Sequence, residues 1–298
     1  MSNSQVITHD FDYYSPKTIE EALESLKAPG ARVLAGGTDV LNEIKTGGQR
    51  PQALVYILGI RELDFLKWEH GLKIGSATLF CTLEEDERIK QTYPAIHDAV
   101  KSMGAVQIRN LATPVGNLCT ASPGADSAPP LMALNARVEI SRKNDRGEIE
   151  RRTLPLEEFF IGPRKTVLEQ GELVTTILIP GPSPSSGSAF RKIARVTLSI
   201  AKINCAVYVV REGDTCTHVR AALGGVAPKP VRAFKFEQTL AGKKLTPSSL
   251  ARAAEVLSED ISPRNARSTA AYKRHAASFL IRDTLEAAWK RSGGEIRR

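Results

Sequence analysis

The sequence has no long hydrophobic run, and its cysteines are few. Nowhere in its 298 residues do apolar side chains continue for the roughly 18 positions that a membrane-spanning helix requires. The first residues, Met-Ser-Asn-Ser-Gln, lack the basic-then-apolar order of a secretory signal. The four cysteines form no C-x-x-C pair, and no histidine stands at metal-ligand spacing from them. We therefore expect a cytoplasmic protein with reduced thiols, without a disulfide framework, a zinc site or a membrane span.

The signatures of the common nucleotide and hydrolytic sites are also missing. The chain contains neither G-x-G-x-x-G nor G-x-x-x-x-G-K-[ST], the Rossmann and P-loop phosphate motifs. Its five histidines are isolated, and His97 falls within a predicted amphipathic helix, where a packing or surface role is more common than catalysis. No motif positions a Ser-His-Asp set or a pair of carboxylates. These absences favour a protein that holds a cofactor, with no catalytic and no metal-ligating residue of its own.

Positive charge is in excess, but it is not arranged as in nucleic-acid-binding proteins. The formal net charge is +8, and the basic residues are spread along the chain and enriched toward the C-terminus. No basic stretch carries the interleaved aromatic residues that stack on bases. A solvated or subunit-facing basic surface is therefore favoured, and a basic nucleic-acid-binding protein is the weaker alternative.

Length and pattern predict two domains of mixed composition. The length suggests two domains, or one large domain with subdomains, and 42% of the residues are apolar. A segment rich in Gly, Pro and Ser at 181–188 is the clearest break between them. Strands come in groups followed by helices, which favours an α+β fold over a doubly wound sheet. The expected helices cover 18–27, 94–103 and 269–290, with another beginning at 126–134, and the expected strands cover 33–35, 53–57, 72–77, 137–141, 173–179, 189–193, 203–210 and 219–223.

Two segments of small residues carry most of the functional information. The first reads Arg-Val-Leu-Ala-Gly-Gly-Thr-Asp at 32–39, and the second reads Ile-Arg-Asn-Leu-Ala-Thr-Pro-Val-Gly-Asn-Leu-Cys at 108–119. Glycines allow backbone N–H groups to approach an anion closely, because no Cβ stands in the way. Two such loops brought together could hold both phosphates of a dinucleotide, although a single Gly-Gly-Thr is more often a plain turn.

With these segments in place, the whole chain resembles a known family. It resembles the FAD-binding medium subunit of the molybdenum hydroxylases, a family that includes carbon monoxide dehydrogenase and xanthine dehydrogenase. Seven landmarks stand in the family's order, at residues 11–22, 34–39, 107–117, 121–126, 188–193, 224–228 and 271–275. Each is weak alone, but seven in order over nearly the whole chain are hard to produce by chance.

The resemblance implies a fold, a function and partners. The fold is a two-subdomain FAD-binding domain of the vanillyl-alcohol-oxidase/PCMH type at 1–181, with subdomains at about 1–58 and 59–181, followed by a smaller α+β domain at 188–292. The implied function is to pass electrons from a 2Fe-2S subunit through FAD to an acceptor. A large molybdopterin subunit completes the complex, as a dimer of heterotrimers. Neither the substrate nor the electron acceptor follows from this chain.

The resemblance also implies the residues that bind FAD. Backbone N–H groups at 36–38 contact the pyrophosphate, Asp126 accepts hydrogen bonds from FAD hydroxyls, and Met103 packs on the adenine. The full set is Val33, Leu34, Ala35, Gly36, Gly37, Thr38, Asp39, Val40, Met103, Thr113, Gly116, Asn117, Asp126, Val174, Arg191 and Lys192. Pro114 has no N–H, so the second loop is expected to make fewer backbone bonds.

Simpler interpretations of four of these positions stay open. Asp126 could cap the helix that follows it, Met103 could be ordinary core, and Arg191 and Lys192 could be plain strand charges. At the level of the whole protein, a stand-alone flavin reductase of the same fold, such as UDP-N-acetylenolpyruvoylglucosamine reductase, is the main rival. Such an enzyme would need its own acid and substrate pocket, which the sequence does not reveal.

Overall fold

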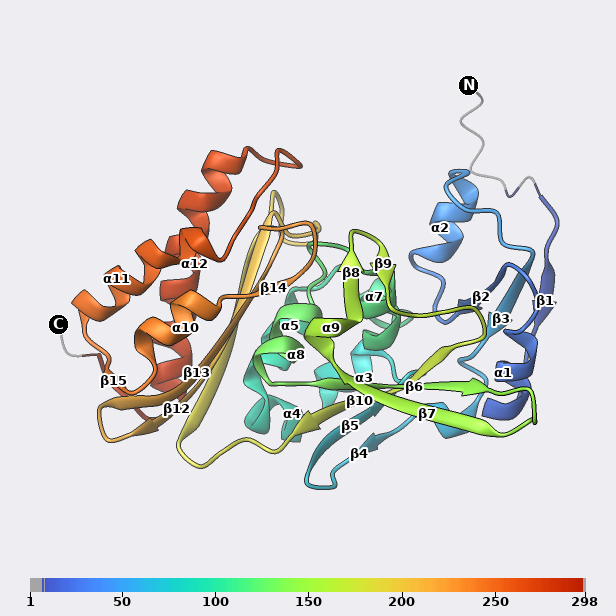
Figure 1. The fold of residues 1–298 in the computed structure, drawn as a ribbon, viewed down its shortest axis with the longest axis horizontal. Coiled ribbons are helices and arrows are strands. Elements are labelled where there is room, and N and C mark those ends of the chain that lie inside the picture. Colours follow the sequence, from blue (N-terminus) through green and yellow to red (C-terminus); the bar gives the residue numbers. More distant parts are fainter. Residues whose placement is uncertain (1–6, 8, 297–298) are drawn as a thin grey trace.

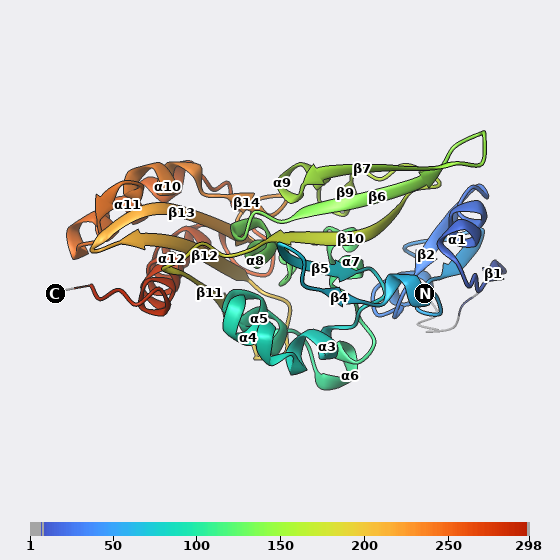
Figure 2. The same ribbon diagram turned by 90° about the horizontal axis from the view of Figure 1, so that it is seen from below.

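Three parts lie in a row along the longest axis of the molecule (Figures 1 and 2). The computed structural model describes residue 7 and residues 9–296. The first part contains a parallel sheet. The middle part contains a larger antiparallel sheet with most of the short helices. The third part contains a second antiparallel sheet that is covered by helices. The predicted α+β class is confirmed. No helix among the described residues is both long and apolar enough to cross a bilayer.

The first part is a small parallel sheet in the order β1-β3-β2. Its elements are β1 (Asp12–Tyr14), α1 (Ile19–Ser25), β2 (Ala31–Leu34), α2 (Val40–Lys45) and β3 (Ala53–Tyr56). Thr18 caps α1 as predicted, because its side chain accepts from the Glu21 amide at 3.2 Å. The Glu21 carboxylate accepts from the amide of Lys17 rather than Thr18, so only half of the predicted capping box is present.

The middle part surrounds a sheet in the order β4-β5-β10-β6-β7. In Figure 2, α3 to α6 lie below this sheet, and β6 and β7 extend along its upper side. Its strands are β4 (Leu66–Lys67), β5 (Gly71–Gly75), β6 (Arg137–Lys143), β7 (Ile149–Pro155) and β10 (Leu173–Pro180), with a separate hairpin of β8 (Phe160–Gly162) and β9 (Lys165–Thr166). Its helices are the 3-10 turn η1 (Arg61–Leu63), α3 (Phe80–Glu85), α4 (Glu87–Thr92), α5 (Pro94–Ser102), α6 (Val106–Arg109), α7 (Pro114–Thr120), α8 (Ala128–Ala133) and α9 (Leu156–Phe159).

The third part is a sheet in the order β11-β12-β13-β14, with β15 paired to β13. The long helix α12 packs against β11 and β12 and buries Trp289. The strands are β11 (Ser186–Ile193), β12 (Ile203–Glu212), β13 (Thr215–Gly224), β14 (Val231–Arg232) and β15 (Lys243–Lys244). The helices are α10 (Phe234–Leu240), α11 (Pro247–Val256), η2 (Leu257–Glu259) and α12 (Ala270–Arg291).

The middle and third parts share an apolar seam, which fixes their relative position. Ala95 and Ala99 of α5 pack against Phe190 of β11 and Ala206 of β12. The expected linker at 181–188 is shorter than its composition suggests. Because β10 ends at Pro180 and β11 begins at Ser186, the Gly, Pro and Ser residues form a tight connection rather than a flexible tether.

Candidate functional site

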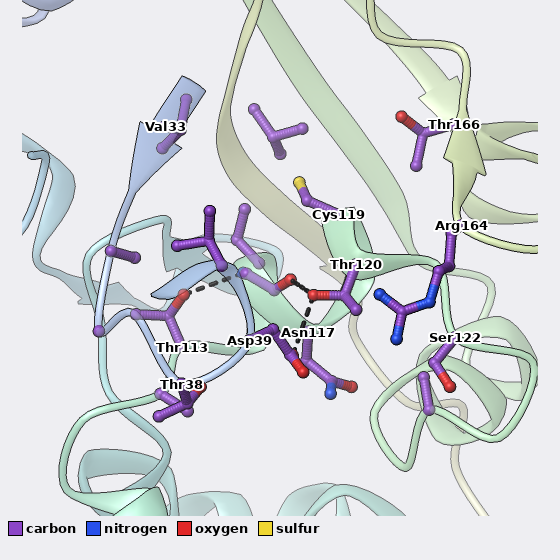
Figure 3. A pocket seen from close by; sticks show the side chains of 18 of the residues that line it. Val33, Thr38, Asp39, Thr113, Asn117, Cys119, Thr120, Ser122, Arg164 and Thr166 are labelled. Carbon is purple, nitrogen blue, oxygen red and sulfur yellow. Dashed lines mark hydrogen bonds between the residues drawn. The ribbon is translucent and has the colours of Figure 1, made fainter. Parts of the chain in front are cut away.

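A cavity lies between the first part and the middle part of the molecule, and residues 198–200 and Arg267 of the third part also line it. Its volume is about 780 Å³, within the 300–1,000 Å³ range that is usual for sites of small molecules and cofactors. Both glycine-containing segments line it, although about 80 residues separate them in sequence. In Figure 3 the side chains of Asp39, Asn117 and Thr120 lie close together, and Arg164 faces them from the opposite side.

The first segment is an open loop between β2 and α2. Gly37 adopts a φ of +70°, which favours glycine over residues with a Cβ. Among the described residues, the backbone N–H groups of positions 36–39 find no hydrogen-bond acceptor. Four successive unpaired donors in a loop that lines a cavity are the arrangement that binds an anion.

Gly36 is required for a reason that the sequence did not reveal. A Cβ placed there would lie 1.7 Å from the carbonyl oxygen of Leu111. The absence of a side chain at Gly36 therefore lets the loop touch the second segment at Leu111, just before α7 begins. The glycine pair thus joins the two walls of the cavity, in addition to exposing backbone donors.

The second segment is the start of a helix, not a loop, which corrects the sequence-based interpretation. Thr113 is the N-cap of α7, and its Oγ1 accepts from the Gly116 amide at 2.9 Å. Pro114 occupies the first helical position, where a backbone N–H has no partner within the helix and where proline is favoured. The missing N–H of Pro114 therefore removes no bond from the helix.

Hydrogen bonds between side chains hold the polar groups around α7 in defined orientations. The Asn117 Oδ1 accepts from the Ser127 hydroxyl at 2.6 Å, which leaves its amide NH₂ as the donor side. The Asp39 carboxylate accepts from the Thr120 hydroxyl at 3.0 Å, so this contact joins the N-cap of α2 to the last residue of α7. Burial raises the pKa of the neighbouring Cys119 thiol to about 12, so the thiol stays protonated at neutral pH.

Asp126 is held by a buried ion pair. Its carboxylate accepts from the Lys192 ammonium at 2.7 Å and from the Asn204 amide at 2.8 Å. The helix-cap alternative is wrong, because Ser127 occupies the N-cap of α8 and no side chain caps that helix. Burial raises the pKa of Asp126, and the Lys192 ammonium opposes part of that rise.

Thirteen of the sixteen predicted residues line the cavity, and Leu34, Arg191 and Lys192 do not. Leu34 is buried in a small core with Ile44 and Leu54. Arg191 is 44% exposed and pairs with Asp283 at 3.0 Å, away from the site. Lys192 lies behind Asp126. The simpler interpretation, a plain strand charge, therefore describes Arg191 but not Lys192.

Several lining residues escaped the sequence analysis. Arg164, at the tip of the β8–β9 hairpin with a φ of +57°, forms an ion pair with Glu43 of α2. Large apolar side chains also line the cavity while more than a third of each is exposed, namely Ile108, Ile161, Leu198 and Ile200. No local pattern marks these positions, because the packing of distant segments brings them together.

Comparison with known proteins identifies the family. The family described as "FAD binding domain in molybdopterin dehydrogenase" matches residues 9–182, and "CO dehydrogenase flavoprotein C-terminal domain" matches residues 188–288. The chain belongs to the FAD-binding subunits of the molybdenum hydroxylases. It is therefore a flavoprotein subunit of an oxidoreductase, with FAD as its cofactor.

Individual relatives agree over almost the full length of the chain. The xanthine dehydrogenase FAD-binding subunit of Escherichia coli O157:H7 is 33% identical over 95% of this chain and 98% of its own. The carbon monoxide dehydrogenase medium chain of Hydrogenophaga pseudoflava is 31% identical over 94% and 98%. A solved carbon monoxide dehydrogenase from that organism matches with a TM-score of 0.90, covering 96% of this chain and 99% of that one, at 31% identity. These relatives do not favour the stand-alone reductase.

The residues of the cavity fit FAD. The loop at 36–39 offers to a pyrophosphate backbone donors that no other described residue uses, and the Asp126 carboxylate offers acceptors to ribose hydroxyls. Met103 and Val174 contribute apolar surface to the same cavity. Donors, acceptors and apolar wall are thus present in one space of suitable volume.

Proposed function

We propose that this chain is the electron-transfer subunit of a molybdenum hydroxylase complex, passing electrons from a 2Fe-2S subunit to an acceptor. The observation that carries the proposal is the cavity itself, where a loop with unpaired N–H donors faces the capped start of α7. FAD supplies the redox chemistry when bound, and the residues of this chain bind and orient it.

The proposal gives residues on both sides of the cavity a role in binding FAD. The N–H groups of Gly36, Gly37 and Thr38 bind the pyrophosphate, and Asn117 donates to FAD from the start of α7. Met103 packs on the adenine side. The domain limits belong to the same proposal, with an FAD-binding domain at 1–181, divided at about residue 58, and a C-terminal domain at 188–292.

The apolar rim supports a partner docked over the cavity. Four large apolar residues that line the cavity are between 39% and 62% exposed, namely Ile108, Ile161, Leu198 and Ile200. Exposed apolar residues gathered in one place mark interaction sites more often than chance exposure does. We assign the complete assembly as a dimer of heterotrimers with a small 2Fe-2S subunit and a large molybdopterin subunit, in the cytoplasm.

The identity of the cofactor is tested by extraction. Heat-released cofactor from the purified chain is separated on a column and compared with authentic FAD and FMN. FAD is expected, because the cavity contains the Asp126 carboxylate for ribose hydroxyls and Met103 for the adenine side, in addition to the donor loop at 36–39, and FMN has neither an adenine nor its ribose. Recovery of FMN alone would contradict the proposed site.

The role in electron transfer is tested by reconstitution. The chain is expressed alone and together with its two expected partners, and bleaching of the flavin absorbance is followed after addition of xanthine, carbon monoxide or nicotinate, which the names of relatives suggest. Bleaching is expected only in the complex. A chain that oxidises one of these substrates at full rate without partners would revive the stand-alone flavoenzyme.

A further inference from the structure

A buried contact joins the third sheet to the wall of the FAD cavity. Lys192 of β11 and Asn204 of β12 stand directly opposite each other in the strand pair, so both side chains are on the same face of the sheet. Both donate to the carboxylate of Asp126, at 2.7 and 2.8 Å. The register of the third sheet therefore sets where this cavity-lining carboxylate lies.

Lys192 holds a second part of the same wall. Its ammonium also donates at 2.8 Å to the carbonyl oxygen of Ser102, the last residue of α5. The next residue, Met103, lines the cavity. With only 6% of its side chain exposed, Lys192 stands behind the cavity wall rather than in it.

We propose that Lys192 and Asn204 are positioning residues that hold the Asp126 carboxylate in place as the hydrogen-bond acceptor for FAD. This inference rests on the proposed function, in which Asp126 binds hydroxyls of the cofactor. The family resemblance placed Lys192 among the residues that bind FAD directly, whereas here Lys192 acts through Asp126. The third part of the molecule would then determine how tightly the first two parts bind FAD.

The charge of Lys192 matters because Asp126 is buried. Burial raises the pKa of Asp126, and Lys192 is the charged group in contact with it among the described residues. Asn204 from β12 is neutral. Removing the ammonium therefore raises the pKa of Asp126 further, which favours the protonated carboxyl at the acid end of the pH range. A protonated carboxyl is the weaker acceptor for a hydroxyl.

The experiment measures the affinity of the full-length apo-chain for FAD between pH 6 and pH 9 by quenching of flavin fluorescence. The variants are K192M, K192Q, K192R and the double variant D126N/K192M. K192Q keeps a side-chain donor but not the charge, so it decides the question if K192M folds poorly. The matched control is R191M, because Arg191 is the preceding residue on β11 but points to the opposite face and pairs with Asp283.

The unmodified chain, K192R and R191M are expected to bind with similar affinity and little dependence on pH. K192M and K192Q should raise the Kd at pH 7 by about tenfold or more, the range for a lost charge-assisted hydrogen bond. Their Kd should fall as the pH rises, because Asp126 ionises again. The double variant should bind weakly at every pH, because it has no carboxyl to titrate.

Three results would contradict different claims. Wild-type affinity and a flat pH profile in both K192M and K192Q would refute the positioning role while leaving the FAD site intact. If the unmodified chain bound no FAD, the proposed function itself would fail, and this inference with it. A weaker but pH-independent Kd in K192M and K192Q would assign Lys192 to packing alone, which also contradicts the proposal.

Discussion

The two segments that meet at the FAD cavity have similar composition and different structures. Residues 36–39 form an open loop whose N–H groups are unpaired among the described residues. Residues 113–117 begin a helix, and there the Gly116 and Asn117 amides are already bonded to the side chain and the carbonyl of Thr113. Small residues therefore serve two purposes here. In the loop they leave backbone N–H donors exposed, and in the helix they fit the closely packed first turn of α7.

This difference gives the loop at 36–39 and the start of α7 different roles in FAD binding. The loop can give several backbone N–H donors to a phosphate. By contrast, α7 offers mainly the side-chain NH₂ of Asn117, together with a rigid surface. Substitutions in the loop should therefore weaken FAD binding most strongly. Substitutions in α7 should mainly lower the free energy of unfolding.

The largest effect is expected for Gly36→Ala. Its Cβ would lie 1.7 Å from the Leu111 carbonyl oxygen, which is backbone and cannot rotate away, so the two walls must separate. We expect a loss of FAD affinity above about 3 kcal/mol, as for other severe steric changes. The flavin-to-protein ratio is the measurement, and Gly48→Ala is the control, because a Cβ there meets only ordinary contacts. Normal flavin content in Gly36→Ala would disprove the close approach of the walls.

A smaller effect is expected for Gly37→Val. The positive φ opposes a β-branched residue by about 1–2 kcal/mol or more, while the contact with Leu41 involves a side chain that can move. Gly47→Val is the matched control, because Gly47 has a φ of +76° and nothing within 4 Å of its Cβ position. Both variants should show similar thermal destabilisation, and only Gly37→Val should lose FAD. Equal FAD content in the two variants would remove the loop from the site.

The sequence predicted the loop better than the helix, for a physical reason. Gly37 needs its positive φ within a few residues of chain, so local composition carries the signal. The start of α7 is also local, because Thr113 followed by Pro114 is a helix-start pattern. The family resemblance directed attention to the missing N–H of Pro114, and the helix was not recognised.

Contacts between distant segments could not be predicted from local patterns. The approach of Gly36 to Leu111, the ion pair of Arg164 with Glu43 and the burial of Lys192 against Asp126 each join residues more than 60 positions apart. Neighbouring residues of a strand, such as Arg191 and Lys192, point to opposite faces, but only the packed structure shows which face meets Asp126. The family resemblance supplied both the residues and their expected roles, and the fold shows which of these residues line one cavity.

The α7 wall is tested first by Thr113→Val, which keeps the shape of the side chain and removes the capping oxygen. Stability should fall by about 1 kcal/mol, as for other lost N-caps, and the Kd for FAD should rise by less than about threefold. Thr246→Val is the control, because Thr246 caps α11 in the same way, accepting from the Ser249 amide at 3.1 Å. A large loss of FAD affinity in Thr113→Val alone would show that this hydroxyl contacts the cofactor directly.

The smallest effect is expected for Pro114→Ala, and it separates the two views of the second segment most directly. If the segment were a phosphate-binding loop, the N–H gained at position 114 would tighten FAD binding. Because Pro114 is the first residue of α7, the N–H gained has no partner in the helix, and the unfolded chain gains freedom. We therefore expect a loss of stability of about 0.4–1 kcal/mol with a Kd for FAD within about twofold of the original. Pro247→Ala, at the first position of α11, should show the same loss by thermal denaturation. A clearly tighter Kd in Pro114→Ala would mean that α7 presents its first amide to the cofactor, and that the two walls bind phosphate in the same way.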